Sequence, residues 1–244
     1  MESDSINQSR DQLETNARAR RDLWLLIPVV AAPSIGTLSA LWFWPGPVGS
    51  AVYAGCKLVL YGLPFLLLLK MSRSQRPCFR TDLRGVTGGL FSGTVIGSFI
   101  LGLWFIVLAD KTDTGPLLAV ITENGLGAPV KFWLFAAWLC IGNSLLEEFV
   151  FRWFVDGRLR NLGLQTTWIL PVSAAIFTLH HIFVLGAYFG PTLTIVGASG
   201  VFIGGVLWSI LHLRSSSLTP GWISHALVDL AIVVVGASMM APTT

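Results

Sequence analysis

The stretch FWLFAAWLCIGNSLLEEFVFR, residues 132–152, places two adjacent acids and an arginine at the end of an apolar run. An ionisable residue at bilayer depth costs at least about 2.5–3.5 kcal/mol on insertion scales. A pair of acids in such a run is therefore expected to serve a mechanism. Three more ionisable residues, His181, His225 and Asp229, lie in later apolar runs, and we expect them to join the acids in one site.

The composition predicts the surroundings of that site. Of the 244 residues, 53% are hydrophobic and 12% are charged, whereas soluble domains carry about 25% charged residues. We therefore expect an all-α polytopic membrane protein whose partner is the lipid bilayer, and the small net charge of +3 gives no indication of nucleic acid. The three cysteines are scattered and suggest neither a disulfide framework nor a structural zinc cluster.

Seven stretches are long and apolar enough to cross a bilayer as helices. Proline and glycine mark breaks between them, as in Pro45-Gly46-Pro47. The polar, mixed-charge residues 1–22 are expected to form a disordered cytosolic tail before a membrane domain at 23–244. The predicted spans are approximately 23–44, 48–69, 86–109, 132–152, 166–187, 191–211 and 219–240.

Basic residues alternate between the connecting segments. The tail has four arginines, the 70–85 loop has five basic residues, the segment after the fourth span has three, and the loop before the last span has one. The opposite loops offer only Lys111 and Lys131. By the positive-inside rule, the N-terminus lies in the cytoplasm and the C-terminus lies outside the cell membrane.

Helical spacing separates the roles of the two acids. Glu148 and Arg152 are four residues apart with the acid first, which is the favourable order for an ion pair. Glu147 shares its face with Asn143 and Phe151 and has no such cation. Poorly solvated and beside a like charge, Glu147 suits a general base or acid. The alternative is an interfacial charge cluster at the end of a helix.

The histidines allow two interpretations each. His181 follows His180, so the two side chains face different ways, and His181 either enters the site or packs through a hydrogen bond. His225 and Asp229 share a helical face, so the carboxylate can orient the imidazole, or the pair can join helices structurally. Lys57 lies deep in the second span and is expected to pair with an acid.

Two carboxylates and two or three imidazoles in a membrane cavity fit the activation of water. One acid would take a proton from water while imidazoles orient it and donors stabilise an oxyanion. Glu147, His181 and His225 also make a His₂Glu set of the kind that holds catalytic zinc. The residues do not choose between metal-bound and metal-free water.

The motifs resemble those of the CPBP intramembrane proteases, which include the CAAX prenyl proteases and the bacterial Abi-type proteins. The family pattern is EExxxR, then FxxxH, then HxxxN or HxxxD. It is matched here by Glu147-Glu148 with Arg152, by Phe177 with His181, and by His225 with Asp229. The matching stretch runs from about Glu147 to Leu230, within a motif core at 131–240.

The resemblance implies intramembrane endoproteolysis of a membrane-embedded or lipidated protein, at a site opened toward the cytosol. Glu147 would activate the water with His181, and Glu148 and Arg152 would support that glutamate. His225 and Asp229 would hold the oxyanion or orient the substrate. The family is classed as metalloprotease-like, which makes zinc the candidate cofactor, with Glu147, His181 and His225 as its candidate ligands.

This chain departs from the family pattern at two positions. Trp153 stands where the family often has glycine, so the turn there is expected to differ. Asp229 replaces the common asparagine, and an ionised aspartate cannot donate a hydrogen bond to an oxyanion.

The lengths of the helices also affect how the motifs can meet, because the acids lie far along the chain from the next turn. To bring the motifs level, we expect Phe154–Leu159 to be an amphipathic stretch at the membrane surface.

Two other functions use the same residues. A proton-coupled carrier would employ the acids and histidines as a relay, but the sequence has no internal repeat and no paired broken helices. A non-catalytic scaffold or immunity protein would keep the family fold without the chemistry, although a scaffold has no evident use for deep acids.

Overall fold

Every secondary-structure element within the described residues is helical. The structure, a computed structural model, describes residues 2–240, with side chains described for residues 12–240. The main helices are α1 (Glu2–Leu38), α2 (Pro47–Lys70), α3 (Leu83–Leu103), α4 (Gly115–Glu123), α5 (Pro129–Ala137), α6 (Ser144–Glu148), α7 (Asp156–Asn161), α8 (Thr166–Tyr188), α9 (Pro191–Ser215) and α10 (Thr219–Met239). Short π or 3-10 segments extend or join them: η1 (Ser39–Phe43), η2 (Arg73–Gln75), η3 (Trp104–Leu108), η4 (Ala109–Lys111), η5 (Trp138–Asn143) and η6 (Phe149–Val155).

Seven helical stretches within the described residues are long and apolar enough to cross a membrane, which confirms the predicted all-α fold and number of spans. They are Gln12–Phe43, Pro47–Lys70, Leu83–Lys111, Pro129–Asn161, Thr166–Tyr188, Pro191–Ser215 and Thr219–Met239. Large apolar side chains on the outside, such as Phe91 and Phe99 of α3, are exposed in the isolated protein. Such a surface is compatible with lipid as the surrounding solvent. The chain is an integral membrane protein.

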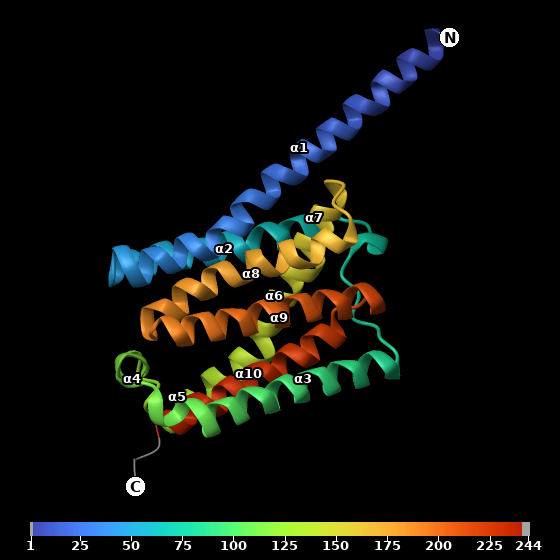
Figure 1. Ribbon diagram of the computed structural model, residues 1–244. Helices are drawn as coiled ribbons and strands as arrows, with labels where there is room; N and C mark the ends of the chain where they lie inside the picture. The colour runs from blue at the N-terminus through green and yellow to red at the C-terminus, as the bar shows by residue number, and fades with distance from the viewer. Residues whose placement is uncertain (1, 241–244) are drawn as a thin grey trace.

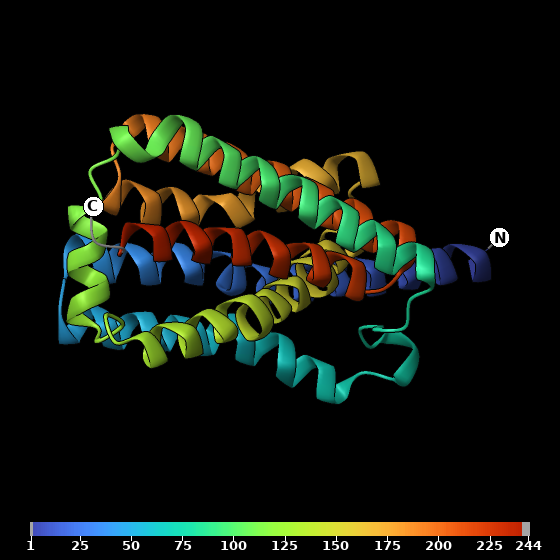
Figure 2. The same cartoon turned by 90° about the horizontal axis from the view of Figure 1, so that it is seen from below.

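The helices form a bundle in which neighbours in sequence are mostly neighbours in space (Figure 1). Helix α1 packs on α2 and α8, α8 packs on α9, α9 packs on α10, and α10 packs on α3. The composite stretch from α5 to α7 crosses the bundle obliquely and contacts α10 through η5 and α6 (Figure 2). This crossing brings the acids of the fourth span against the last span.

Helix α1 includes most of the segment 1–22 that the sequence predicts as a disordered cytosolic tail. Helix α1 begins at Glu2 and continues without a break into the first span, so its polar half projects beyond the bundle (Figure 1). Asp22, at the junction, is buried and accepts hydrogen bonds from Arg158 Nη1 at 2.8 Å and Asn161 Nδ2 at 3.0 Å. A charged residue among apolar neighbours is thus paired, and the pair ties α1 to α7.

The surface position expected for Phe154–Leu159 is wrong. Phe154, Val155, Asp156 and Leu159 are buried, and the helix runs on to Asn161. The stretch packs against α1 and α8. Its polar residue Arg158 forms an ion pair with Asp22 of α1 instead of contacting water.

Three glycines bring α3 against α10. Gly89, Gly93 and Gly97 are buried on one face of α3. A Cβ added at Gly93 would lie 2.8 Å from the Ser224 carbonyl oxygen, which is closer than atoms of this kind approach. The small residues therefore set the position of α10, the helix that carries His225 and Asp229.

The close contact between the α3 glycines and α10 leads to a prediction about stability. Gly93→Ala should lower the free energy of unfolding by about 1–3 kcal/mol, because the methyl group must push α10 away. Gly102→Ala on the same helix is the matched control, since a Cβ there meets nothing within 4 Å. Thermal unfolding of both variants in detergent checks this. Equal melting temperatures would show that α10 is not positioned by the glycine face.

Candidate active site

The two acids lie on a single α-helical turn between two π segments. Glu147 and Glu148 end α6, with η5 before it and η6 after it. A π segment widens the helix and leaves carbonyl groups outside the usual ladder, and such segments are frequent at functional sites. The Ile141 carbonyl in η5 accepts a hydrogen bond from Trp222 Nε1 of α10 at 3.1 Å. The irregular helix thus gains a partner in α10 while its acids turn toward the same helix.

Glu148 forms the centre of a buried ion cluster. One carboxylate oxygen lies 3.5 Å from Arg152 Nε, and the other lies 3.1 Å from His225 Nδ1. Glu148 and Arg152 are each only 1% exposed. An ionised carboxylate can only accept, so His225 Nδ1 carries the hydrogen and donates it. The expected ion pair between Glu148 and Arg152 is present, and Glu148 also orients the imidazole.

A glycine makes room for that carboxylate. A Cβ at Gly221, near the start of α10, would lie 2.6 Å from Glu148 Oε2. The sequence marks Pro220-Gly221 only as a turn. In the structure Gly221 is the point where α10 approaches the acid most closely, which a larger residue would prevent.

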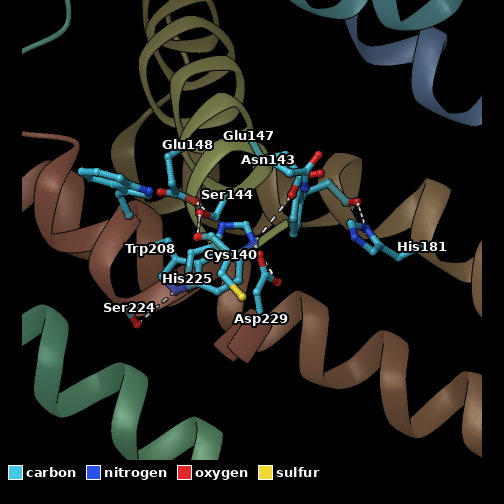
Figure 3. Close-up of polar contacts among 12 residues, drawn as sticks. Cys140, Asn143, Ser144, Glu147, Glu148, His181, Trp208, Ser224, His225 and Asp229 are labelled. Atoms are coloured by element: carbon cyan, nitrogen blue, oxygen red, sulfur yellow. Dashed lines mark hydrogen bonds and ion pairs between the residues drawn. The ribbon is translucent and has the colours of Figure 1, made fainter. Parts of the chain in front are cut away.

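The second nitrogen of His225 faces the other two acids. Nε2 lies 3.6 Å from Glu147 Oε2 and 3.7 Å from Asp229 Oδ1. These separations exceed the length of a direct hydrogen bond. Figure 3 shows His225 among Glu147, Glu148 and Asp229. One ring nitrogen of His225 therefore contacts Glu148, and the other lies near Glu147 and Asp229.

An aromatic ring fixes the plane of His225. Trp208 of α9 stacks on the imidazole with ring centroids 3.8 Å apart and an interplanar angle of 11°. Its Nε1 donates to Ser224 Oγ at 3.2 Å, and Ser92 of α3 donates to the same hydroxyl at 3.0 Å. Sequence analysis missed Trp208 and Ser224, because one of ten tryptophans and a serine one residue before the motif carry no distinguishing pattern.

Two serine hydroxyl groups accept hydrogen bonds from Arg152, and a second acid accepts one from one of these serines. Its Nη1 donates to Ser209 Oγ at 2.7 Å and to Ser173 Oγ at 3.3 Å. Ser209 in turn donates to Asp156 Oδ2 at 3.0 Å. These polar residues of α7, α8 and α9 were also missed from the sequence. They keep the guanidinium charge compensated away from water, so Arg152 serves as a fixed support for Glu148.

His181 lies at the edge of the cluster. Its Nδ1 is 2.9 Å from the Phe177 carbonyl oxygen, to which it donates, leaving Nε2 as the free acceptor. Glu147 is within electrostatic range, but no direct contact joins His181 to the acids, and Figure 3 shows it apart from His225. The Phe177 ring also packs against the His181 ring, with centroids 4.7 Å apart.

Trp153, the departure from the family pattern, continues the helix instead of turning it. Its ring stacks on Phe149 with centroids 4.8 Å apart, and its Nε1 donates to the Gln75 carbonyl at 3.0 Å. The residue thus joins η6 to the loop after α2.

The candidate zinc ligands can be compared with the geometry that a metal requires. Within the part of the chain that the structure describes, no three His, Cys, Asp or Glu side chains converge on a point where they could hold one ion. Glu147, His181 and His225 do not fit zinc in this arrangement, since His181 stands apart. Zinc stays a prediction, and the arrangement of these side chains is that of acids, bases and hydrogen-bond partners.

Residues 129–231 match the family model described as Type II CAAX prenyl endopeptidase Rce1-like. This motif-bearing part of the chain is similar to that family. The match confirms the resemblance predicted from the three motifs, and it spans α5 to α10 but not the three preceding spans. Neither the curated proteins nor the solved structures yield a match to the chain.

The geometry of this CAAX protease-like cluster predicts different costs for the two adjacent acids. Glu148→Gln removes the charge that compensates buried Arg152 and should lower the free energy of unfolding by about 3–5 kcal/mol. Glu147→Gln, the matched control, breaks no contact shorter than 3.6 Å to His225 and should cost much less. Thermal unfolding of both proteins in one detergent compares them. A smaller loss for Glu148→Gln than for Glu147→Gln would contradict the assignment of support to Glu148.

Proposed function

We propose that the protein is an intramembrane endopeptidase in which Glu147 activates the water that cleaves a membrane-embedded or lipidated protein. One observation carries this proposal. Glu147 is a buried carboxylate that lies 3.6 Å from His225 Nε2, whereas the adjacent Glu148 lies between Arg152 and His225 Nδ1. Two neighbouring acids in different environments are the arrangement in which one stays fixed and the other exchanges protons.

The proposed reaction uses Glu147 twice. Glu147 takes a proton from water, and the resulting hydroxide attacks the carbonyl carbon of the scissile peptide. The protonated Glu147 then returns that proton to the leaving amine as the carbon–nitrogen bond breaks. Atoms balance without any further reactant, because water supplies both the hydroxyl and the proton of the products.

His225 is the proposed donor to the oxyanion. When both ring nitrogens carry hydrogen, Nδ1 donates to Glu148, and Nε2 is available to the negative oxygen of the tetrahedral intermediate. The stacked Trp208 ring holds the imidazole plane so that this donor is preorganised. Asp229 acts through His225, because its carboxylate lies near Nε2 and an ionised carboxylate has no hydrogen to donate. His181 would orient the water on the other side of Glu147.

The proposed orientation places the N-terminus in the cytoplasm and the C-terminus outside the cell membrane. It follows from the basic loops, and Cys78 in the exposed loop between α2 and α3 provides the test. A membrane-impermeant maleimide should label Cys78 in inverted vesicles and not in intact cells. Cys78→Ser is the control for reaction at the other two cysteines. Labelling of Cys78 from outside the cell would contradict this orientation and indicate the opposite one.

The proteolysis is tested by mapping protein termini in membranes from cells that make wild type or Glu147→Gln at equal abundance. New C- and N-termini should appear only with wild type, because the amide cannot take a proton from water. Glu123→Gln, an exposed residue of α4, is the matched control and should give the wild-type pattern. Identical termini with folded wild type and Glu147→Gln would instead support a scaffold or a carrier.

A further inference from the structure

The proposed reaction gives the oxyanion one protein donor, the Nε2 hydrogen of His225. The two other side chains near that nitrogen are carboxylates, Glu147 and Asp229, which as ions accept hydrogen bonds and cannot donate them. A preorganised donor that points at a developing oxyanion contributes about 10²–10³ in kcat. A second donor would have to come from another side chain whose hydrogen is free.

Most donors around the cluster are already engaged. Trp222 Nε1 donates to a carbonyl oxygen of η5, Trp208 Nε1 donates to a serine of α10, and Ser144 Oγ donates to a carbonyl oxygen one turn before it. Asn143 is different, because its Oδ1 accepts a hydrogen bond while its Nδ2 makes none within the described residues. The Asn143 side chain is also only partly buried, so a substrate can reach it.

Two residues of α2 set the orientation of the Asn143 amide. Lys57 Nζ is an ammonium group that can only donate, and it donates to Tyr61 Oη at 3.3 Å. Tyr61 therefore directs its own hydrogen to another acceptor, and Oη donates to Asn143 Oδ1 at 3.4 Å. Because the amide oxygen is bound to Tyr61, the Nδ2 group keeps both of its hydrogens for another partner.

This arrangement accounts for a lysine deep in a membrane span. Lys57 lies about 15 Å from the start of α2 at 1.5 Å per residue, where an ammonium group in lipid is costly. The acid partner expected from the sequence is absent, since no carboxylate in the described part of the chain forms an ion pair with Lys57. Its Nζ lies 5.4 and 5.3 Å from the ring centroids of Tyr53 and Tyr61, whose faces stabilise a cation.

Asn143 lies on the same side of its helix as the proposed base. Glu147 follows it by four residues, and the backbone of Asn143 is already α-helical, so one regular turn separates them. Side chains with this spacing are neighbours, with Cβ atoms about 5–6 Å apart. Tyr61 and Lys57 are both within electrostatic range of Glu147. Figure 3 shows Asn143 next to Glu147, in the same cluster as His225.

We propose that Asn143 Nδ2 is a second donor to the oxyanion, and that Tyr61 and Lys57 position its amide. The inference rests on the proposed endopeptidase function and adds one catalytic residue and two positioning residues to it. Both positioning residues belong to α2, outside the residues 129–231 that match the protease family. An amide at this place supplies the hydrogen that the carboxylate of Asp229 cannot give.

The test compares kcat and KM of full-length variants in detergent. The substrate is a quenched fluorescent peptide with a farnesylated cysteine three residues before its C-terminus, a choice that follows the description of the matched family. Asn143→Leu should lower kcat about 10²-fold and change KM less than about twofold, because the lost donor acts in the transition state and not on the bound substrate. Thermal unfolding gives the folded fraction by which each kcat is normalised.

A second amide provides the rescue variant. Adding Asp229→Asn to Asn143→Leu should raise kcat at least about tenfold over Asn143→Leu alone, because an amide close to His225 Nε2 can replace the missing donor. A packing defect at Asn143 would not be repaired by an exchange in α10. A wild-type kcat in Asn143→Leu, or no recovery in the double variant, would overturn the inference, while cleavage by wild type would retain the endopeptidase function.

Tyr61→Phe reports on the positioning of the amide. Without the hydroxyl group the amide can rotate, so kcat should fall about five- to tenfold at unchanged KM, the effect of one neutral hydrogen bond. In the Asn143→Leu background the same change should not lower kcat further, because the amide is already absent. Tyr53→Phe on the same helix is the matched control and should keep the wild-type kcat, since its hydroxyl group makes no hydrogen bond to a described residue. Additive losses in the double variant would overturn the role of Tyr61.

Formation of new termini in membranes separates this inference from the endopeptidase function. If wild type leaves the peptide uncut, the same variants are compared by the rate at which Glu147-dependent termini form. Termini that form equally fast with wild type and with Asn143→Leu would retain the proteolysis and remove the role of Asn143. The absence of Glu147-dependent termini would remove the endopeptidase function and this inference together.

Discussion

The contact between Glu148, Arg152 and His225 is the constraint on which the site depends. Glu148 and Arg152 are almost completely buried and lie 3.5 Å apart as an ion pair, so removing either partner leaves an uncompensated buried charge. The same carboxylate fixes which nitrogen of His225 carries a hydrogen. Because Glu148 is occupied in this way, Glu147 is the acid left available. The different contacts of these two neighbouring glutamates thus follow from a single buried ion pair.

The rest of the bundle keeps this contact in place. Glycines of α3 allow α10 to lie close, and Gly221 lets α10 reach the carboxylate itself. Trp208 of α9 stacks on the imidazole, and hydroxyl groups of α8 and α9 support the arginine. Helices α8, α9 and α10 therefore meet at the ion pair of Glu148 and Arg152, and α3 packs behind α10. Rigid support of this kind holds polar side chains in one geometry.

Much of the fold could be predicted from the sequence, because it is governed by local rules. Apolar length predicted the seven spans, and four-residue spacing predicted both the Glu148–Arg152 pair and the shared face of His225 and Asp229. The contact of His225 with Glu148 joins residues 77 positions apart and has no local pattern. The π segments on both sides of the acids turn side chains in a way that regular periodicity does not predict. The burial of Phe154–Leu159 was missed because it also depends on a distant contact. Arg158 pairs with Asp22, which lies 136 positions earlier in the chain.

The projecting half of α1 has a mechanical consequence. A helix is stiff along its axis, and this one runs unbroken from the polar segment into the membrane. At the junction Asp22 is bound to Arg158 and Asn161, which belong to the same continuous helical stretch as Glu147 and Glu148. The contacts of Asp22 therefore couple the position of α1 to that of the helical stretch that bears Glu147.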